Sequence, residues 1–201
     1  MGFPDRFVHL PNFVDAGKFE PFYTSDNKTI VYFGRLIKEK GIKVLIDAVK
    51  DCNLRLKIIG DGPQRKELEE NVLREDIPNV EFLGYKKGDA LQNEIRNCLF
   101  TVLPSEWYEN NPLSIIESFA LGKPVIGANI GGIPELIKEG ETGLLFEPGN
   151  LIDLREKIEL LLSDNALCSN MGRNARKFVE EEFNPEKHYQ SLLQIYRSLV
   201  K

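Results

Sequence analysis

A chain of 201 residues is long enough for one domain, or for one domain with an appendage. Its 42% hydrophobic and 28% charged residues are typical of a folded globular protein and exclude a disordered chain. A net charge of −5 argues against a general nucleic-acid binder, which would carry a basic surplus, although a small anionic ligand needs only a local cluster of cations.

The cysteines and the apolar segments restrict the class of protein further. Cys52, Cys98 and Cys168 are far apart and form no C-x-x-C pair, so we expect neither a metal site nor a disulfide framework. No stretch approaches the ~20 apolar residues that cross a bilayer, and the first residues lack the apolar run of a secretory signal. We therefore expect a cytoplasmic chain without a transmembrane segment, and leave open a peripheral membrane contact of a longer protein.

In chain order, an irregular segment is followed by alternating strands and helices. Residues 1–28 contain Pro4, Pro11 and Pro21 and show no regular pattern. Short β-rich runs then occupy residues 30–34, 56–60, 80–84, 99–104, 124–129 and 143–148. Several are almost wholly apolar, as in strands covered on both faces, and helix-like segments lie between them. This alternation predicts an α/β fold, a single Rossmann-like doubly wound domain with a mainly parallel six-stranded sheet.

The last part of the chain reads as helical. Residues 150–163 and roughly 165–182 have helical patterns, and a final helix begins near Pro185, because proline favours a first turn. This helical C-terminal tail carries an apolar face that needs a partner.

Two loops after strands carry charges and glycines. Arg35 follows the first strand and Lys40 opens the next helix, so both cations are expected at the carboxyl edge of the sheet, where they suit a diphosphate. The alternative is a solvated loop with ordinary surface charges. The second loop, residues 60–63, is not G-x-G-x-x-G, and on its own it reads as a turn in which Asp61 caps a helix that starts at Pro63.

Two glutamates flank an expected helix start. Pro112 suits the first turn of a helix that runs to about Leu121, so Glu109 precedes this helix and Glu117 lies inside it. The backbone N–H groups of Leu113 and Ser114 are then free to bind an anion. Glu117 could accept from two neighbouring hydroxyls, as on a ribose. Both glutamates could instead be solvated charges, but the apolar flanks of Glu117 favour function.

A Gly-Gly-Ile-Pro-Glu turn at residues 131–135 joins a strand to a short helix, which alone is an ordinary βα loop. His9 and His188 have no Ser, Cys or Asp companion at the spacing of a triad. Trp107 and Tyr108 could stack on a ligand, but we expect them to pack their own loop.

Taken in order, these motifs resemble the C-terminal, donor-binding domain of family 4, or group 1, retaining glycosyltransferases, which have the GT-B architecture of two Rossmann-like domains. The resemblance covers about residues 29–150 and is carried by these segments: YFGRLIKEKG (32–41), IIGDGP (58–63), VEFLGY (80–85) and the run from ENNP to EPGN (109–150). The E-x₇-E spacing together with the GG-I-P-E turn is highly specific.

The resemblance implies a role for each matching residue. Arg35 and Lys40 would neutralise the diphosphate of a UDP-, GDP- or ADP-sugar donor without a required cofactor or metal, and Glu117 would bind the ribose. Glu109, as the catalytic residue, would contact the transferred sugar, and Gly84 and Tyr85 would hold the base. The phosphate-binding loop departs from the family, because Asn110-Asn111-Pro112 replaces Gly-Phe-Gly and Pro112 has no N–H. Phosphate contacts would then come from Asn111, Leu113 and Ser114.

The resemblance also implies an organisation and an activity. Residues 1–28 would be an interdomain linker remnant, 29–184 the nucleotide-sugar-binding domain, and 185–201 a helix that packs towards an N-terminal acceptor domain absent from this chain. We expect the donor half of an enzyme that transfers a hexose-type sugar to a saccharide or lipid-linked acceptor, poorly active alone. The alternatives are a sugar-nucleotide epimerase or hydrolase of the same fold and a non-catalytic nucleotide-sugar-binding subunit.

Overall fold

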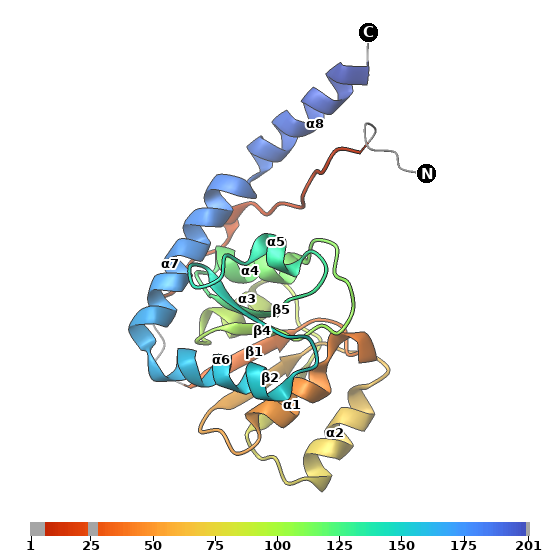
Figure 1. Cartoon of the computed structure of the whole chain (residues 1–201), viewed down its shortest axis with the longest axis vertical. Helices are drawn as coiled ribbons and strands as arrows, with labels where there is room; N and C mark the ends of the chain where they lie inside the picture. Colours follow the sequence, from red (N-terminus) through yellow and green to blue (C-terminus); the bar gives the residue numbers. More distant parts are fainter. Residues whose placement is uncertain (1–6, 24–27, 200–201) are drawn as a thin grey trace.

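The computed structural model describes residues 7–23 and 28–199, and its core is one parallel sheet wrapped by helices (Figure 1). The strands run in the order β3-β2-β1-β4-β5-β6, and every pair is parallel. The strands are β1 Thr29–Phe33, β2 Arg55–Ile59, β3 Val80–Gly84, β4 Thr101–Leu103, β5 Val125–Ala128 and β6 Gly143–Phe146. The predicted fold class is confirmed, and the predicted strands differ from the observed ones only at their ends.

Helices connect the strands and form the C-terminal part. They are η1 Ala16–Lys18, η2 Lys38–Lys40, α1 Ile42–Val49, α2 Arg65–Arg74, α3 Asp89–Arg96, α4 Leu113–Ala120, α5 Ile133–Leu136, α6 Leu151–Ser163, α7 Asn165–Glu182 and α8 Pro185–Leu199. Within the described ranges, no helix has both the length and the apolar character needed to span a membrane.

The strand order reverses direction between β1 and β4. The chain builds outward from β1 through β2 to β3, then returns to the other side of β1 and builds outward through β4, β5 and β6. In doubly wound sheets the crevice at the carboxyl ends of the strands beside such a reversal is where ligands bind. The loops after β1 and β4 are therefore the first place to look for a site.

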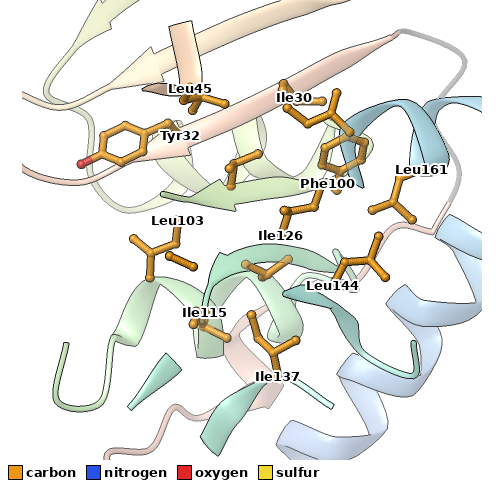
Figure 2. Packing of buried hydrophobic residues seen from close by; sticks show 14 of the residues in the cluster. Ile30, Tyr32, Leu45, Phe100, Leu103, Ile115, Ile126, Ile137, Leu144 and Leu161 are labelled. Atoms are coloured by element: carbon orange, nitrogen blue, oxygen red, sulfur yellow. The ribbon is translucent and has the colours of Figure 1, made fainter. Parts of the chain in front are cut away.

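Both faces of the sheet are covered, as the apolar strands predict. In β1, Ile30 and Tyr32 face the larger core, which includes Leu45 of α1 and Leu161 of α6. Figure 2 shows this core between the strands and these helices. Val31 and Phe33 face the other way and pack with Ile95 of α3. A strand buried on both faces cannot be shifted without exposing apolar side chains, so β1 is a fixed base for the loop that follows it.

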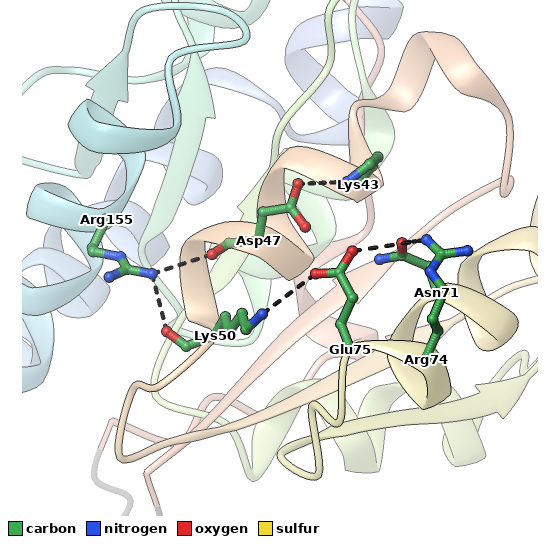
Figure 3. A network of polar contacts seen from close by, with 7 residues as sticks. All are labelled: Lys43, Asp47, Lys50, Asn71, Arg74, Glu75 and Arg155. Atoms are coloured by element: carbon green, nitrogen blue, oxygen red, sulfur yellow. Dashed lines mark hydrogen bonds and ion pairs between the residues drawn. The ribbon is translucent and has the colours of Figure 1, made fainter.

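Arg155 of α6 fastens α1 to the second half of the sheet. Its guanidinium donates to the carbonyl oxygens of Ala48 at 3.0 Å, Asp47 at 3.2 Å and Lys50 at 3.0 Å. Figure 3 shows the bonds to Asp47 and Lys50. These carbonyls lie at the C-terminal end of α1, where helical carbonyls lack intrahelical partners. A cation there satisfies them and complements the helix dipole.

The N-terminal segment runs beside the C-terminal helices (Figure 1). Val14 N–H donates to the carbonyl of Phe183 at 3.0 Å, and Arg176 of α7 donates to the carbonyls of Phe19 and Ala120. The predicted helical tail is confirmed, and α8 has no buried residue within its described part. The predicted segments 1–28 and 185–201 extend into residues 1–6, 24–27 and 200–201, which lie outside the described residues.

Candidate functional site

The loops after β1 and β2 are joined by backbone hydrogen bonds. Gly34 N–H donates to Ile59 O at 3.0 Å, Leu36 N–H to Asp61 O at 2.9 Å, and Gln64 N–H to Leu36 O at 3.0 Å. Between these fixed points the Arg35 side chain is exposed at the carboxyl edge of the sheet, as predicted.

The expected cap of the following helix is wrong. Helix α2 begins at Arg65 rather than Pro63, and no side chain caps it. Asp61 instead accepts from the N–H of Gly62 at 2.8 Å and lies 3.8 Å from the Arg65 guanidinium. Leu36 of the neighbouring loop bonds to the backbones of Asp61 and Gln64, and residues 63–64 form a turn before the helix, so Asp61 stays at the rim of the site.

Tyr32, at the end of β1, bonds to the backbone of the Arg35 loop. Its buried hydroxyl donates to the carbonyl oxygen of Arg35 at 2.8 Å. Burial, followed by the negative charge of Glu109, raises the pKa of Tyr32 well above its usual range, and Arg35 opposes this only partly. The phenol therefore stays protonated and remains a donor. Because β1 and β4 are paired neighbours in the sheet, Glu109 in the loop after β4 is close enough for its charge to act on this hydroxyl at the end of β1.

An open hollow of about 430 Å³ lies over the carboxyl ends of β1, β2 and β3. It is lined by Phe33, Gly34, Arg35, Ile59, Gly60, Asp61, Tyr85, Lys86, Lys87, Gly88, Leu91 and Glu117. The structure thus brings three predicted site residues together, Arg35, Tyr85 and Glu117. Gly84 lies behind them, where its carbonyl accepts from Gly60 N–H at 2.9 Å. The volume is within the range of small-molecule sites.

Glu117 enters this hollow from α4. Burial raises the pKa of its carboxyl. No hydrogen bond or ion pair engages this carboxylate within the part of the chain that the structure describes. A half-buried carboxylate without a partner is costly, since it loses water and gains nothing in return, and a ligand with hydroxyl donors would relieve that cost.

Sequence reasoning missed the cations beside Tyr85. Lys86 lines the hollow and pairs with Glu94 of α3, which also accepts from Lys57 at 2.7 Å. Burial alone would raise the pKa of Glu94, but the bonds from Lys57 and Lys86 outweigh it and lower that pKa. This bridge ties the loop after β3 to β2. The Lys86-Lys87 pair directly after Tyr85 was the available signal.

A second cluster surrounds Glu109 in the loop after β4. Its Oε1 accepts from the hydroxyl of Ser105 at 2.6 Å and from the ammonium of Lys40. Ser105 is fully buried, and 17% of the Glu109 side-chain surface remains accessible. The structure therefore pairs Lys40 with Glu109. Ser105 was not among the predicted site residues.

The turn at residues 131–132 supports the backbone of the Glu109 loop. Gly132 N–H donates to Glu109 O at 2.7 Å, and a Cβ on Gly132 would lie 1.8 Å from Asn110 O. Gly131 has φ +59°, and a Cβ there would meet the Glu109 backbone oxygen at 2.6 Å. Both glycines are thus needed for close approach of the two loops, which the sequence alone does not show.

The start of α4 leaves donors free, as predicted. Pro112 is the N-cap residue and Ile115 N–H bonds to its carbonyl, whereas the N–H groups of Leu113 and Ser114 have no partner among residues 7–23 and 28–199. Asn111 is engaged by the N-terminal segment. Its Oδ1 accepts from Asn12 N–H at 2.9 Å and its backbone oxygen from Asn12 Nδ2 at 2.8 Å.

His188 contacts the N-terminal segment, whereas Trp107 and Tyr108 are exposed. His188 Nδ1 lies 2.9 Å from Pro11 O, and its ring lies 4.5 Å from that of Phe13, so it holds the N-terminal segment. Trp107 and Tyr108 contact each other edge to face, yet both are exposed, so they do not bury their loop. Within the described ranges, no group of His, Cys, Asp and Glu side chains could hold a metal ion.

Comparisons with known proteins identify the family and the fold of this chain. The family model described as "Glycosyl transferases group 1" matches residues 16–178. An uncharacterised glycosyltransferase of Methanocaldococcus jannaschii is 34% identical over 187 residues, covering 88% of this chain and 53% of that relative. The structure of sucrose-phosphate synthase from Thermosynechococcus elongatus superposes with a TM-score of 0.86 at 29% identity, covering 94% of this chain and 52% of that one.

A third relative was solved with a ligand. The Anabaena protein HepE, in complex with UDP-glucose, has a TM-score of 0.83 at 25% identity, covering 92% of this chain and 56% of its own. The chain spans about half the length of each of these three proteins.

Proposed function

The chain belongs to the group 1 glycosyltransferases, and we propose that it forms the half of a retaining enzyme that binds a nucleotide diphosphate sugar. The observation that carries this proposal is the hollow at the carboxyl edge, where Arg35 and the unpartnered Glu117 line one cavity beside the strand reversal. The UDP-glucose complex of HepE supports the ligand class. The proposed reaction transfers a hexose-type sugar to a saccharide or lipid acceptor.

The nucleoside would occupy the hollow. Glu117 would accept hydrogen bonds from the two ribose hydroxyls, which supply the donors its carboxylate lacks. Tyr85 and the backbone around Gly84 would hold the base, since the Tyr85 ring is exposed at the wall of the hollow. The neighbouring Lys86 keeps this loop on β2 through Glu94.

The diphosphate would lie between Arg35 and the start of α4. Arg35 offers a planar fork of donors, and Leu113 and Ser114 offer free N–H groups at the positive end of a helix dipole. Lys40 pairs with Glu109, so it would act on the diphosphate from that position, adding positive charge that a divalent ion supplies in other enzymes.

Glu109 would contact the transferred sugar. It precedes the proposed phosphate-binding residues in the sequence, whereas Glu117 follows them, and the backbone of its loop is fixed by Gly132. Residues 7–23 would be part of an interdomain linker, and α8 would pack towards an acceptor domain. The exposed aromatic rings of Tyr189 and Tyr196 on α8 support this proposal.

Calorimetry with UDP, GDP and ADP tests the proposal on the 201-residue chain. We expect Arg35→Ala and Glu117→Ala each to weaken binding by roughly tenfold or more, because each removes a charged hydrogen-bonding partner worth ~1.5–3 kcal/mol. Arg55→Ala, on the opposite edge of the sheet, and Glu156→Ala, exposed on α6, are matched controls. Undiminished binding in both test variants would refute the site.

A further inference from the structure

Ser105 is a fully buried hydroxyl that the proposed roles do not use. It follows β4 directly after Pro104, at the strand reversal. Its Oγ donates to Glu109 Oε1 at 2.6 Å, and the same oxygen accepts from Lys40 Nζ. Glu109 Oε1 thus has two protein donors, whereas Oε2 has no partner among the residues that the structure describes.

The segments that carry these groups are locked together. The Lys40-Gly41 turn touches the β4 end, because a Cβ on Gly41 would lie 2.0 Å from Pro104 O. Glu106 N–H also donates to Glu39 O at 2.9 Å, across the same contact. A carboxylate fixed by two donors on two mutually anchored segments cannot rotate freely, so the direction of its second oxygen is set before any ligand arrives.

We propose that Ser105 is a positioning residue that directs Glu109 Oε2 towards a hydroxyl group of the transferred sugar. The inference rests on the proposed function, and it names the ligand group that this oxygen recognises. A carboxylate oxygen can only accept, so the group it recognises carries a hydrogen-bond donor. No covalent step is involved, because the serine acts through Glu109.

The proposal separates recognition of the sugar from recognition of the nucleotide. Without the Ser105 hydroxyl, Lys40 is the remaining described partner of Oε1, so Glu109 can turn both oxygens towards that ammonium. The contact with the sugar is then lost. Arg35, Glu117 and the start of α4 are untouched, so contacts with the free nucleotide persist. If Ser105 had a merely structural role, its substitution would lower the affinity for the free nucleotide and for the sugar nucleotide together.

The test is calorimetry of Ser105→Ala with three probe pairs: UDP and UDP-glucose, GDP and GDP-mannose, ADP and ADP-glucose. For the pair that wild type binds, we expect affinity for the sugar nucleotide to fall roughly tenfold, the size expected for a hydrogen bond to a charged group. Affinity for the free nucleotide should stay within about twofold. Thr101→Val is the matched control, because it removes the buried hydroxyl of Thr101 in β4, which donates to Ser118 at 2.8 Å.

A second variant keeps the test decisive if Ser105→Ala does not fold. Glu109→Gln conserves the shape of the side chain and should show the same selective loss. Where both single variants fold, Ser105→Ala should add nothing to Glu109→Gln, because residues that act as one unit are not additive.

The outcomes separate the two proposals. Equal loss for nucleotide and sugar nucleotide, or no loss for either, overturns the role of Ser105 while leaving the donor site intact. Absence of wild-type binding to all of these probes refutes the proposed function, and the role of Ser105 with it.

Discussion

Gly132 and Glu109 are joined through their backbones, with Gly132 N–H donating to Glu109 O at 2.7 Å. The bond connects the loop after β5 to the loop after β4, and a side chain at Gly132 would collide with Asn110 O. The position of Glu109 therefore depends on two neighbouring strands of the sheet. This explains why a glycine pair and a glutamate separated by more than twenty residues belong to one site.

Gly132→Ala should damage both stability and binding. The new methyl would lie 1.8 Å from Asn110 O, which is backbone and can give way only by moving the Glu109 loop. We expect a loss of ~1–3 kcal/mol in the free energy of unfolding, as for overpacked sites, and weaker binding of the sugar nucleotide, measured by thermal unfolding and calorimetry. Gly17→Ala, whose methyl meets only the Asp15 carboxylate at 3.3 Å, is the control. Equal stability of the two variants would contradict the contact.

Glu117→Gln should stabilise the protein at neutral pH while weakening nucleotide binding. Burial raises the pKa of Glu117 above its ordinary value of 4.5, so the unfolded chain loses this proton at lower pH than the folded chain. The stability from the neutral carboxyl is present below pH 4.5 and is lost as pH rises through the raised pKa. The melting temperature of the variant should therefore exceed that of wild type at neutral pH, with the difference shrinking below pH 4.5.

Exposed Glu156→Gln is the matched control for this pH dependence, since it changes the same chemical group outside the hollow. A melting temperature for Glu117→Gln at or below that of wild type at neutral pH would show that the carboxylate has a stabilising partner.

Tyr32→Phe should loosen the Arg35 loop. The variant keeps the buried ring and removes only the 2.8 Å hydrogen bond to Arg35 O, so we expect a loss of about 1 kcal/mol in the free energy of unfolding. Denaturant unfolding measures it. Burial and Glu109 raise the pKa of Tyr32, so the stability from the protonated phenol is present below the ordinary value of 10.0 and declines above it. The advantage of wild type over the variant should shrink in that alkaline range.

The exposed Tyr196→Phe on α8 is the matched control. A Tyr32→Phe protein as stable as wild type, with unchanged nucleotide affinity, would mean that the hydroxyl does not support the loop.

Arg155→Ala should destabilise the fold without changing nucleotide affinity. It removes a guanidinium that donates to three carbonyls at the end of α1, two of which are drawn in Figure 3, and hydrogen bonds to charged groups contribute ~1.5–3 kcal/mol. Lys157→Ala on the same helix loses only a 3.9 Å ion pair with Asp153 and should change stability by less than about 0.5 kcal/mol. Denaturant unfolding compares the two, and equal effects would contradict the role of Arg155.

The sequence pattern was sufficient to predict the strands of the sheet and the edge at which they end. Strands buried on both faces are read directly from apolar runs, and polar residues directly after them fall at one edge of a parallel sheet. Arg35 was predicted at this edge from the strand pattern, whereas Tyr85 and Glu117 were assigned to the same site through the family resemblance; all three line one hollow.

Contacts between loops could not be predicted in this way. The Lys40–Glu109 pair joins residues 69 positions apart, and the Asn12–Asn111 bonds span 99 positions. A local pattern shows where an element ends, but not which loops approach each other. The helix cap predicted for Asp61 was wrong for the same reason. The backbone oxygen of Asp61 accepts from Leu36 of the neighbouring loop, and its side chain accepts from Gly62 N–H.

A nucleotide-sugar site at the carboxyl edge of the sheet can be observed residue by residue by backbone amide NMR during titration with UDP-glucose, GDP-mannose or ADP-glucose. We expect chemical-shift changes to concentrate at residues 34–35, residues 85–88, Leu113 and Ser114, with little change at the opposite edge around Arg55. Shift changes confined to that opposite edge or to α8, or no change with any of the three ligands, would contradict it.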